Sequence, residues 1–162
     1  MIEIRNATPE EYEAIADLTL IVYVGGGFVE THSPYVDQLR DTAARAEMAD
    51  IKVAVMGDQI VGSVTIAEPG SPYAEVAEPG ELEFRMLAVS PEARSAGVGT
   101  ALVHEVLKTA YDRGDRAVVI STMPDMAAAR RIYDRAGFAP VPERNWAPVP
   151  GVELTVLKYE IS

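Results

Sequence analysis

A glycine-containing turn ahead of an apolar helix is the first stretch of this sequence that could do chemistry. Arg94-x-x-Gly97-x-Gly99 lies between a polar segment and an apolar run with helical spacing. Free backbone N–H groups at a helix start bind anions, and glycine lets a phosphate approach because it has no Cβ. Arg94 adds a positive charge beside them. Two glycines alone are more typical of a sharp entry turn, so the anion interpretation needs further support from the surrounding sequence.

Two well-known nucleotide motifs are excluded for this turn. A P-loop would end in Gly-Lys-Ser or Gly-Lys-Thr, which does not occur here. A dinucleotide fingerprint would need a third glycine at the position of Leu102. An anion held by this turn therefore belongs to another class of ligand.

The turn is positioned by the elements around it. Residues 97–113 predict a helix, because apolar residues recur along one side in rows such as Val98, Leu102 and Val106. Residues 81–89 and 117–121 predict the strands before and after it. A strand, helix, strand unit of this kind is normally a right-handed crossover between parallel strands. The turn then lies at the carboxyl end of the first strand, where ligands bind in α/β sheets.

The rest of the chain continues the α/β pattern. Strands are predicted at residues 2–5, 51–56, 60–67 and 152–161, and helices after Thr8-Pro9, over 33–49 and over 125–136. Three segments read as loops: glycine-rich 24–28, and proline-rich 68–80 and 141–151. By composition the segment 68–80 could pass for a linker, but strand patterns lie on both sides of it, so we expect a surface loop and a single α/β domain over residues 1–162.

Composition excludes several classes of function. The chain has 162 residues, 48% hydrophobic and 24% charged, which is typical of a globular protein. It has no cysteine, which excludes disulfides, thiolate metal sites and a cysteinyl acyl-enzyme. The net charge of −11 argues against nucleic acid as a partner and is compatible with a cationic acceptor or simply with solubility.

Metal and membrane partners are not expected either. The two histidines, His32 and His104, have no partner at a ligand spacing, so we expect no metal site. No apolar run approaches the roughly 20 residues that span a bilayer, and the first residues lack the basic and apolar pattern of a signal peptide. We therefore expect a cytoplasmic protein.

Two further motifs flank the turn and lead to a resemblance. Glu83-Phe84-Arg85-Met86-Leu87-Ala88-Val89 precedes it, and Tyr133-x-x-x-Gly137-Phe138 follows it. In this order and spacing the sequence resembles the GNAT superfamily of acetyl-CoA-dependent N-acetyltransferases, whose pyrophosphate signature the turn matches. The resemblance is dense over residues 51–138. It implies a mixed central sheet of six to seven strands flanked by about four helices, with the fourth and fifth strands splayed apart.

The resemblance also implies a place for acetyl-CoA. The pantetheine arm would lie between the splayed strands and pair with the backbone of residues 81–89 much like an added strand. The residues implied in cofactor binding are Leu87, Ala88, Val89, Arg94, Ser95, Ala96, Gly97, Val98, Gly99 and Thr100. The amide of Val89 would hold the oxygen of the acetyl carbonyl.

Two residues are implied in catalysis. Glu83 occupies the position of a general base in several family members, with Glu81 as a substitute on the same face; the alternative is an ordinary exposed carboxylate or one paired with Arg85. Tyr133 would donate a proton to the coenzyme A sulfur, the alternative being a packing role. Without cysteine, we expect direct attack within a ternary complex. Met126 stands where many relatives have an asparagine, so one polar contact to the cofactor is missing.

The acceptor side is read from segments that border it in the family. Phe28, Tyr35 and Trp146 would wall an apolar pocket and Glu30 would attract an ammonium group, unless these aromatic residues only cap the core. We expect a small-molecule primary amine as the acceptor. A protein amino terminus or lysine, and a non-catalytic acyl-CoA sensor, are the alternatives. An exposed edge on the strand at 152–159 would allow a homodimer.

Overall fold

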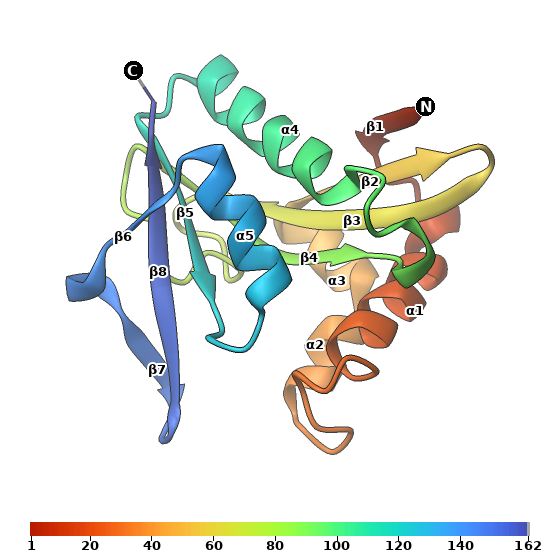
Figure 1. Ribbon diagram of the computed structural model, residues 1–162, viewed down its shortest axis with the longest axis horizontal. Coiled ribbons are helices and arrows are strands. Elements are labelled where there is room, and N and C mark those ends of the chain that lie inside the picture. Colours follow the sequence, from red (N-terminus) through yellow and green to blue (C-terminus); the bar gives the residue numbers. More distant parts are fainter. Residues whose placement is uncertain (162) are drawn as a thin grey trace.

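The computed structural model describes residues 1–161 and consists of one twisted sheet with helices on both faces (Figure 1). The strands are β1 (Ile2–Asn6), β2 (Asp50–Met56), β3 (Gln59–Ala67), β4 (Glu81–Val89), β5 (Ala117–Thr122), β6 (Ala139–Pro140), β7 (Trp146–Val149) and β8 (Val152–Glu160). The α-helices are α1 (Tyr12–Tyr23), α2 (Tyr35–Arg40), α3 (Thr42–Met48), α4 (Val98–Arg113) and α5 (Ala127–Ala136).

The sheet is mixed, with the strand order β1-β2-β3-β4-β5-β8-β6 and β7 paired to β8. Neighbouring strands are antiparallel except β4 and β5, which are parallel. Helices α4 and α5 cover one face, and α1, α2 and α3 cover the other (Figure 1). This arrangement agrees with the mixed α/β sheet that the resemblance implies, with one more strand and one more helix than predicted.

Helix α4 is anchored to the sheet by the apolar row that its sequence predicts. Val98, Leu102 and Val106 are fully buried in the largest core cluster, against residues of β3, β4 and β5. Gly114 ends the helix in a left-handed conformation, which glycine adopts without strain. A helix held along its length has a fixed amino end, and that end faces the ligand-binding edge.

A bulge in β4 redirects the second half of the strand. The register of β3 against β4 moves from Ser63↔Ala88 to Thr65↔Arg85, so β4 carries one extra residue. Met86 lies inside this bulge with φ 55°, a left-handed conformation that is rare for a residue with a side chain. Nothing in the local sequence predicts the bulge, because methionine at that position is compatible with a regular strand.

Strands β4 and β5 separate as expected from the resemblance. They pair only over three residues of each strand, from Glu81↔Ala117 to Glu83↔Val119. Beyond that point β4 continues to Val89 and β5 to Thr122 without pairing to each other. The backbone edges that face the gap are therefore open to an added strand or an extended ligand.

Three sequence predictions differ from the structure. The helix expected at 33–49 is two helices, because Asp41 turns out of the helical region and its carboxylate caps the amide of Ala44. The loop expected at 141–151 contains β7, which pairs with β8 as a hairpin. β8 pairs with β5 over residues 155–160 on one side and with β7 and β6 on the other, so most of this strand lacks the exposed edge on which the homodimer expectation rested. None of the helices described here is long and apolar enough to cross a bilayer.

Close packing between β3 and α4 gives a test of this fold. A Cβ added to Gly62 would lie 2.7 Å from Cγ1 of Val98 and 3.0 Å from Cδ1 of Leu102. We expect Gly62→Ala to lower the free energy of unfolding by about 1–3 kcal/mol, because the helix must move away from the strand. The measurement is chemical denaturation of the variant and the wild type.

A double-mutant cycle supplies the control for this experiment. Val98→Ala removes the nearest methyl groups and costs stability alone, yet it should make Gly62→Ala less costly when the two are combined. Strictly additive losses would mean that the two residues do not pack as described.

Candidate functional site

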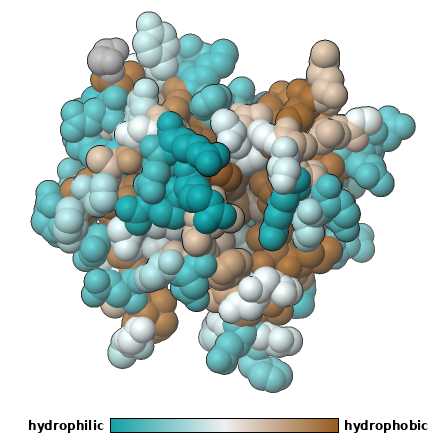
Figure 2. Space-filling view, viewed as in Figure 1, coloured by the Kyte–Doolittle hydropathy of each residue, from teal (hydrophilic) through white to brown (hydrophobic). Residues whose placement is uncertain are grey.

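A cavity of about 690 Å³ lies in the gap between β4 and β5. Residues 84–87 of β4 and residues 120–122 of β5 form its floor, so packed side chains do not fill the gap. The α1–α2 connection borders one side and the β7–β8 hairpin borders the other. Figure 2 shows the molecule hollowed between these two parts, with hydrophobic residues visible at the sides of the hollow.

The amino end of α4 presents unpaired backbone donors, as the glycine turn predicts. Within residues 1–161, hydrogen bonds to protein groups are absent from the amides of five residues of the turn: Ser95, Gly97, Val98, Gly99 and Thr100. The amide of Ala96 differs from the expectation, because it donates to the carbonyl of Ala93 at 3.2 Å. Gly97 caps the helix with φ 82°, and no side chain caps it. Residues 94–97 and Thr100 are exposed and Val98 and Gly99 are buried, so the exposed part of the turn offers its donors to an anion.

Packing between helices also explains why residue 99 is a glycine. A Cβ at Gly99 would lie 2.6 Å from Cδ1 of Ile132 on α5. The missing side chain lets α5 approach the start of α4. Gly97 therefore serves the entry turn and Gly99 serves the contact between helices, while the anion interpretation depends on the unpaired amides of the turn.

Glu83 is a buried carboxylate at the inner end of the cavity. Its residue is 1% exposed, and its Oε1 accepts hydrogen bonds from the amides of Val76 and Ala77 at 2.8 and 2.9 Å. Burial raises the pKa of Glu83 above its ordinary value, and the backbone donors oppose this only in part. Arg85 does not pair with Glu83, which removes the alternative of a salt bridge between them. A carboxylate with a raised pKa in a cavity has the character of a general base.

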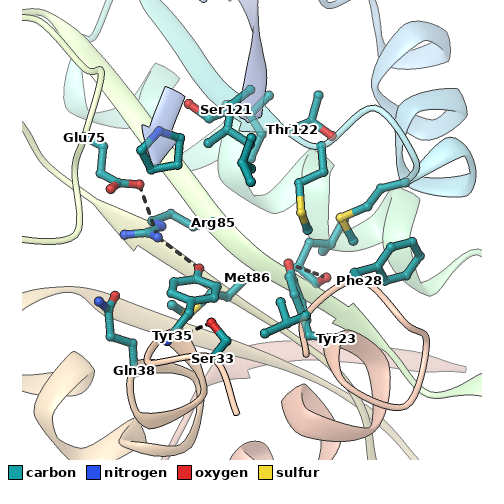
Figure 3. Close-up of a pocket in the computed structure, with 18 of the residues that line it drawn as sticks. Tyr23, Phe28, Ser33, Tyr35, Gln38, Glu75, Arg85, Met86, Ser121 and Thr122 are labelled. Atoms are coloured by element: carbon teal, nitrogen blue, oxygen red, sulfur yellow. Dashed lines mark hydrogen bonds and ion pairs between the residues drawn. The ribbon is translucent and has the colours of Figure 1, made fainter. Parts of the chain in front are cut away.

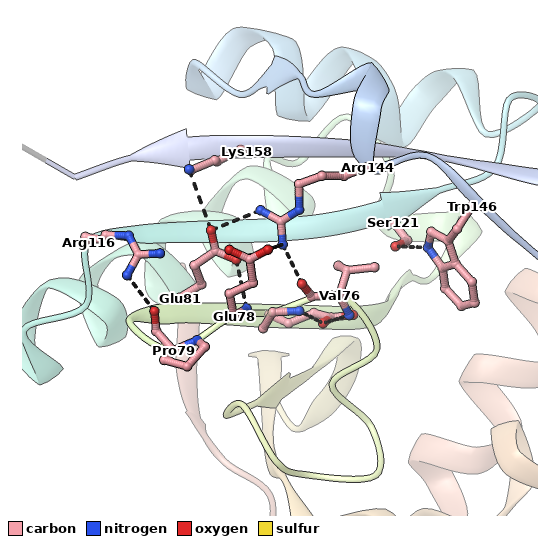
Figure 4. Close-up of polar contacts among 11 residues, drawn as sticks. Val76, Glu78, Pro79, Glu81, Arg116, Ser121, Arg144, Trp146 and Lys158 are labelled. Carbon is pink, nitrogen blue, oxygen red and sulfur yellow. Dashed lines mark hydrogen bonds and ion pairs between the residues drawn. The ribbon is translucent and has the colours of Figure 1, made fainter.

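Glu81 is also buried but has a different environment (Figure 4). Arg144 binds it through two hydrogen bonds of 2.9 and 3.0 Å, and Nζ of Lys158 lies 3.6 Å from Oε2. Burial opposes ionisation, yet these cations and the amide of Glu78 hold the pKa of Glu81 below its ordinary value. Glu81 does not line the cavity, so its position argues against a role as substitute base.

Arg144 connects this ion pair to the cavity. Its second guanidinium nitrogen also donates to the carbonyl of Val76, whose amide binds Glu83 (Figure 4). The loop of residues 68–80 is tied down further by a hydrogen bond from Arg116 to the carbonyl of Pro79. The sequence showed this loop as proline-rich only, and the role of Arg144 in holding it depends on contacts more than sixty residues apart.

Tyr133 extends from α5 into the core with its ring against Phe84 and Phe138, at centroid distances of 5.6 and 6.0 Å. The residue is 3% exposed and also lines the cavity. Within the described part of the chain its hydroxyl has no hydrogen-bond partner, so its donor is unused. Burial raises the pKa of Tyr133, which keeps the phenol protonated. A packing role for the ring and a donor role for the hydroxyl are compatible in this position.

The four residues predicted on the acceptor side all line the same cavity: Phe28, Glu30, Tyr35 and Trp146. The indole N–H of Trp146 donates to the hydroxyl of Ser121 at 3.0 Å, which fixes the β7 wall to the end of β5 (Figure 4). Phe28 comes from the glycine-rich connection after α1. The sequence could name these residues only through the resemblance, since they come from two distant segments, residues 28–35 and Trp146.

Arg85 is a cavity residue that the sequence interpretation did not assign to the site. Its Nη2 donates to the hydroxyl of Tyr35 at 2.9 Å and lies 3.2 Å from Oε1 of Glu75, and its guanidinium lies 5.7 Å from the centre of the Tyr35 ring (Figure 3). The signal was available, because Arg85 shares the alternating face of β4 with Glu83. Met126, in place of the family's asparagine, lines the cavity and precedes α5.

Comparison with known proteins decides the family. The profile described as "Acetyltransferase (GNAT) family" matches residues 11–138. The chain belongs to the GNAT family of acetyltransferases. Members of the family use acetyl-CoA. In the part of the chain described here, no three His, Cys, Asp or Glu side chains are grouped to hold a metal ion.

Curated relatives of this GNAT chain are longer than the matched segments. Mycothiol acetyltransferase from Cellulomonas flavigena is 36% identical over 103 residues, covering 62% of this chain and 29% of that protein. N-acetyltransferase 8F1 from Rattus norvegicus is 32% identical over 133 residues, covering 73% of this chain and 58% of that protein. The chain thus spans less than two thirds of the length of either relative.

Solved GNAT structures have the same fold at low sequence identity. An acetyltransferase from Staphylococcus aureus Mu50 superposes with a TM-score of 0.79 at 13% identity, with both chains covered completely. A Salmonella typhimurium protein, solved with acetyl-CoA as its cofactor, gives a TM-score of 0.70 at 18% identity, covering 100% of this chain and 95% of the other. The unpaired amides after Arg94 and the open gap beside β4 fit the diphosphate and the extended arm of that cofactor.

The opposite environments of the two glutamates give the test of the site. We expect Arg144→Met to lower the free energy of unfolding by about 3–5 kcal/mol, because it leaves Glu81 buried with only the more distant Lys158. The pKa of Glu81 is lowered in the fold, so the stability from this pair is present above its ordinary value of 4.5 and is lost as the pH falls through the lowered pKa. Denaturation of wild type and variant between neutral and acid pH measures both effects.

Two further variants make this test specific. Adding Glu81→Gln to Arg144→Met should recover part of the loss, because the unpaired charge is gone. Lys158→Met should cost less than Arg144→Met, since Lys158 is 3.6 Å away and 26% exposed. A loss from Arg144→Met that is unchanged by Glu81→Gln would contradict the ion-pair account.

Proposed function

We propose that this protein is an N-acetyltransferase that moves the acetyl group of acetyl-CoA to the primary amine of a small molecule, by direct attack in a ternary complex. The observation that carries the proposal is a set of three features along β4: unpaired amides at the start of the helix that follows the strand, a gap between β4 and β5, and a cavity in this gap lined by Glu83 and Tyr133. Each feature serves a different part of the reaction.

The roles of the protein groups follow from their environments. Glu83, with its raised pKa, accepts the proton that the amine loses, directly or through water. The amide of Val89 holds the oxygen of the thioester carbonyl while the new C–N bond forms. Tyr133 gives its phenolic proton to the sulfur as the C–S bond breaks, which its unused donor allows. The diphosphate is held by the residues from Arg94 to Thr100 and the arm by Leu87, Ala88 and Val89.

The shape of the cavity favours a small acceptor over a protein. Its volume of about 690 Å³ is within the range of small-molecule sites, although coenzyme A would fill part of it. Phe28, Glu30 and Tyr35 on one side and Trp146 on the other bound it, where a protein acceptor would need a groove open at both ends. The name of the mycothiol acetyltransferase relative also fits a small acceptor. A cytoplasmic location and a homodimer stay predictions.

The experiment that tests the function measures thiol release. Purified protein is incubated with acetyl-CoA and a panel of primary amines and peptides, and free coenzyme A is detected with a thiol reagent. We expect amine-dependent release with one or more small amines. Acetyl-CoA binding without release for any acceptor would favour a non-catalytic sensor, and release only with peptides would favour a protein acceptor.

Tyr133→Phe tests the proton donor within this assay. The variant keeps the ring that packs on Phe84 and Phe138, so stability and acetyl-CoA affinity should change little. We expect kcat to fall by about 10²- to 10⁴-fold, because the departing sulfur no longer receives a proton. The affinity for acetyl-CoA is measured by titration calorimetry. An unchanged kcat would remove Tyr133 from the mechanism.

Glu83→Gln tests the proposed base, and this variant should be less active but more stable than wild type. Removing the carboxylate lowers kcat/KM by about 10²- to 10⁴-fold, while the amide oxygen still accepts from Val76 and Ala77. Because the fold raises the pKa of Glu83, ionisation costs stability at pH values above that raised pKa and costs nothing well below the ordinary 4.5. The variant should therefore melt at a higher temperature than wild type at neutral pH, and the difference should disappear in acid.

The two glutamates provide a matched comparison for this prediction. Glu81→Gln on the neighbouring inward position should lower the melting temperature at neutral pH, because it weakens the pair with Arg144. Opposite signs for the two substitutions are the expected result. Loss of stability in both variants would contradict a base that is held at an energetic cost.

A further inference from the structure

Arg85 is the one basic side chain among the cavity-lining residues of the described chain. Its side chain is 13% exposed, on the β4 face that also carries Glu83. The other charged groups lining the cavity are the carboxylates of Glu30, Glu75 and Glu83, and most of the remaining lining is apolar. A lone guanidinium in such surroundings binds a carboxylate strongly, because little water competes with it.

The present partners of Arg85 leave this capacity largely unused. Tyr35 contributes a neutral hydroxyl and a ring face, and the carbonyl of Tyr73 lies at a long 3.4 Å. Among residues 1–161 the only carboxylate in an ion pair with Arg85 is that of Glu75, whose Oε1 lies 3.2 Å from Nη2 without forming a two-pronged pair. Glu75 is on the surface loop 68–80 and its side chain is 32% exposed. This single contact to a partly exposed loop carboxylate does not use the two-pronged geometry of the guanidinium, so a substrate carboxylate that forms two parallel hydrogen bonds can take its place.

We propose that Arg85 binds a carboxylate of the acceptor, which takes the place of Glu75, so that the acceptor is an amino acid with an apolar side chain. The inference rests on the proposed acetyltransferase function and names the acceptor class of the same site. Tyr35 is a positioning residue here: its hydroxyl and ring hold the guanidinium toward the cavity (Figure 3).

The spacing of Glu83 and Arg85 supports an amine and a carboxylate on one small molecule. Two residues along a strand place their Cα atoms about 7 Å apart with both side chains on the same face. An amine near Glu83 and a carboxylate near Arg85 are then separated by a few bonds, as in an α- or β-amino acid. The rest of the molecule meets an apolar wall that includes Phe28, Met123 and Met126.

A purely structural role for Arg85 makes a different prediction. If the guanidinium only joined loop 68–80 to α2 through Glu75 and Tyr35, removing either charge of the ion pair would have the same effect. If Glu75 instead occupies the place of the substrate carboxylate, Arg85→Gln and Glu75→Gln must act in opposite directions. These two variants therefore separate recognition from support.

The experiment measures thiol release with matched acceptors: leucine against isopentylamine, and phenylalanine against phenethylamine. Wild type should use the amino acids with higher kcat/KM than the amines. Arg85→Gln should raise KM for the amino acids by about 10- to 100-fold and change KM for the amines by about twofold or less. Glu75→Gln should lower KM for the amino acids about threefold or more, since its carboxylate no longer competes.

The outcomes distinguish this inference from the function on which it rests. Carboxylate recognition would be overturned if wild type used the amines with the same kcat/KM as the amino acids. It would also be overturned if Arg85→Gln and Glu75→Gln had equal effects on both kinds of acceptor. Either result would leave the acetyltransferase function intact. Absence of thiol release with every acceptor would overturn the function itself. Should Arg85→Gln not fold, the direction of the Glu75→Gln effect decides, because a supporting ion pair gives a higher KM and a displaced one gives a lower KM.

Discussion

The separation of β4 from β5 after three paired residues is the constraint on which the rest of the structure depends. Two parallel strands in a sheet normally continue side by side, and the unpaired edges beyond Glu83 and Val119 carry backbone groups that require partners. The extra residue of β4 and the left-handed Met86 turn the strand away at this point. An extended ligand with amide groups satisfies such edges, so the cofactor arm and the strand geometry explain each other.

The main free-energy cost of this site is the burial of two carboxylates on β4. Glu81 and Glu83 are two residues apart on the same strand, and both are almost inaccessible to water. Two cations accompany Glu81, whereas Glu83 has only backbone donors, so their pKa values move in opposite directions. A carboxylate that is needed for proton transfer must not be paired with arginine, because pairing would lower its basicity. Arg144 meets both needs by pairing with Glu81 and holding the segment that binds Glu83.

The sequence predicted the parts of the structure that depend on local patterns. The burial of α4 follows from its apolar rows, and β5 reads as a continuous apolar run because it is covered on both faces. The break at Asp41 was missed because a cap inside a helical pattern is a local competition that the pattern does not resolve. β7 was missed because its proline, Pro148, is typical of a loop, and only an edge position tolerates it.

For the site as well, the sequence could name residues that lie in local motifs but not residues that act through long-range contacts. Glu83, Tyr133 and the glycine turn lie in contiguous motifs, so a family resemblance can carry them. Arg144 and Glu75 act through contacts between segments that no motif joins, and their roles emerge only when the loop 68–80 is folded onto β4.

In the proposed function, the loop of residues 68–80 links the proposed base Glu83 to the group that faces the acceptor. Its backbone amides at Val76 and Ala77 bind Glu83, and its side chain at Glu75 meets Arg85. A substitution in the loop leaves its backbone amides in place, so the hydrogen bonds to Glu83 are kept. A substitution of Glu75 removes its carboxylate, so the group that faces Arg85 changes. The cofactor side has no such freedom, since Gly97 must adopt a left-handed conformation and Gly99 must admit α5. Selectivity can therefore vary on one side of β4 while the other side stays fixed by geometry.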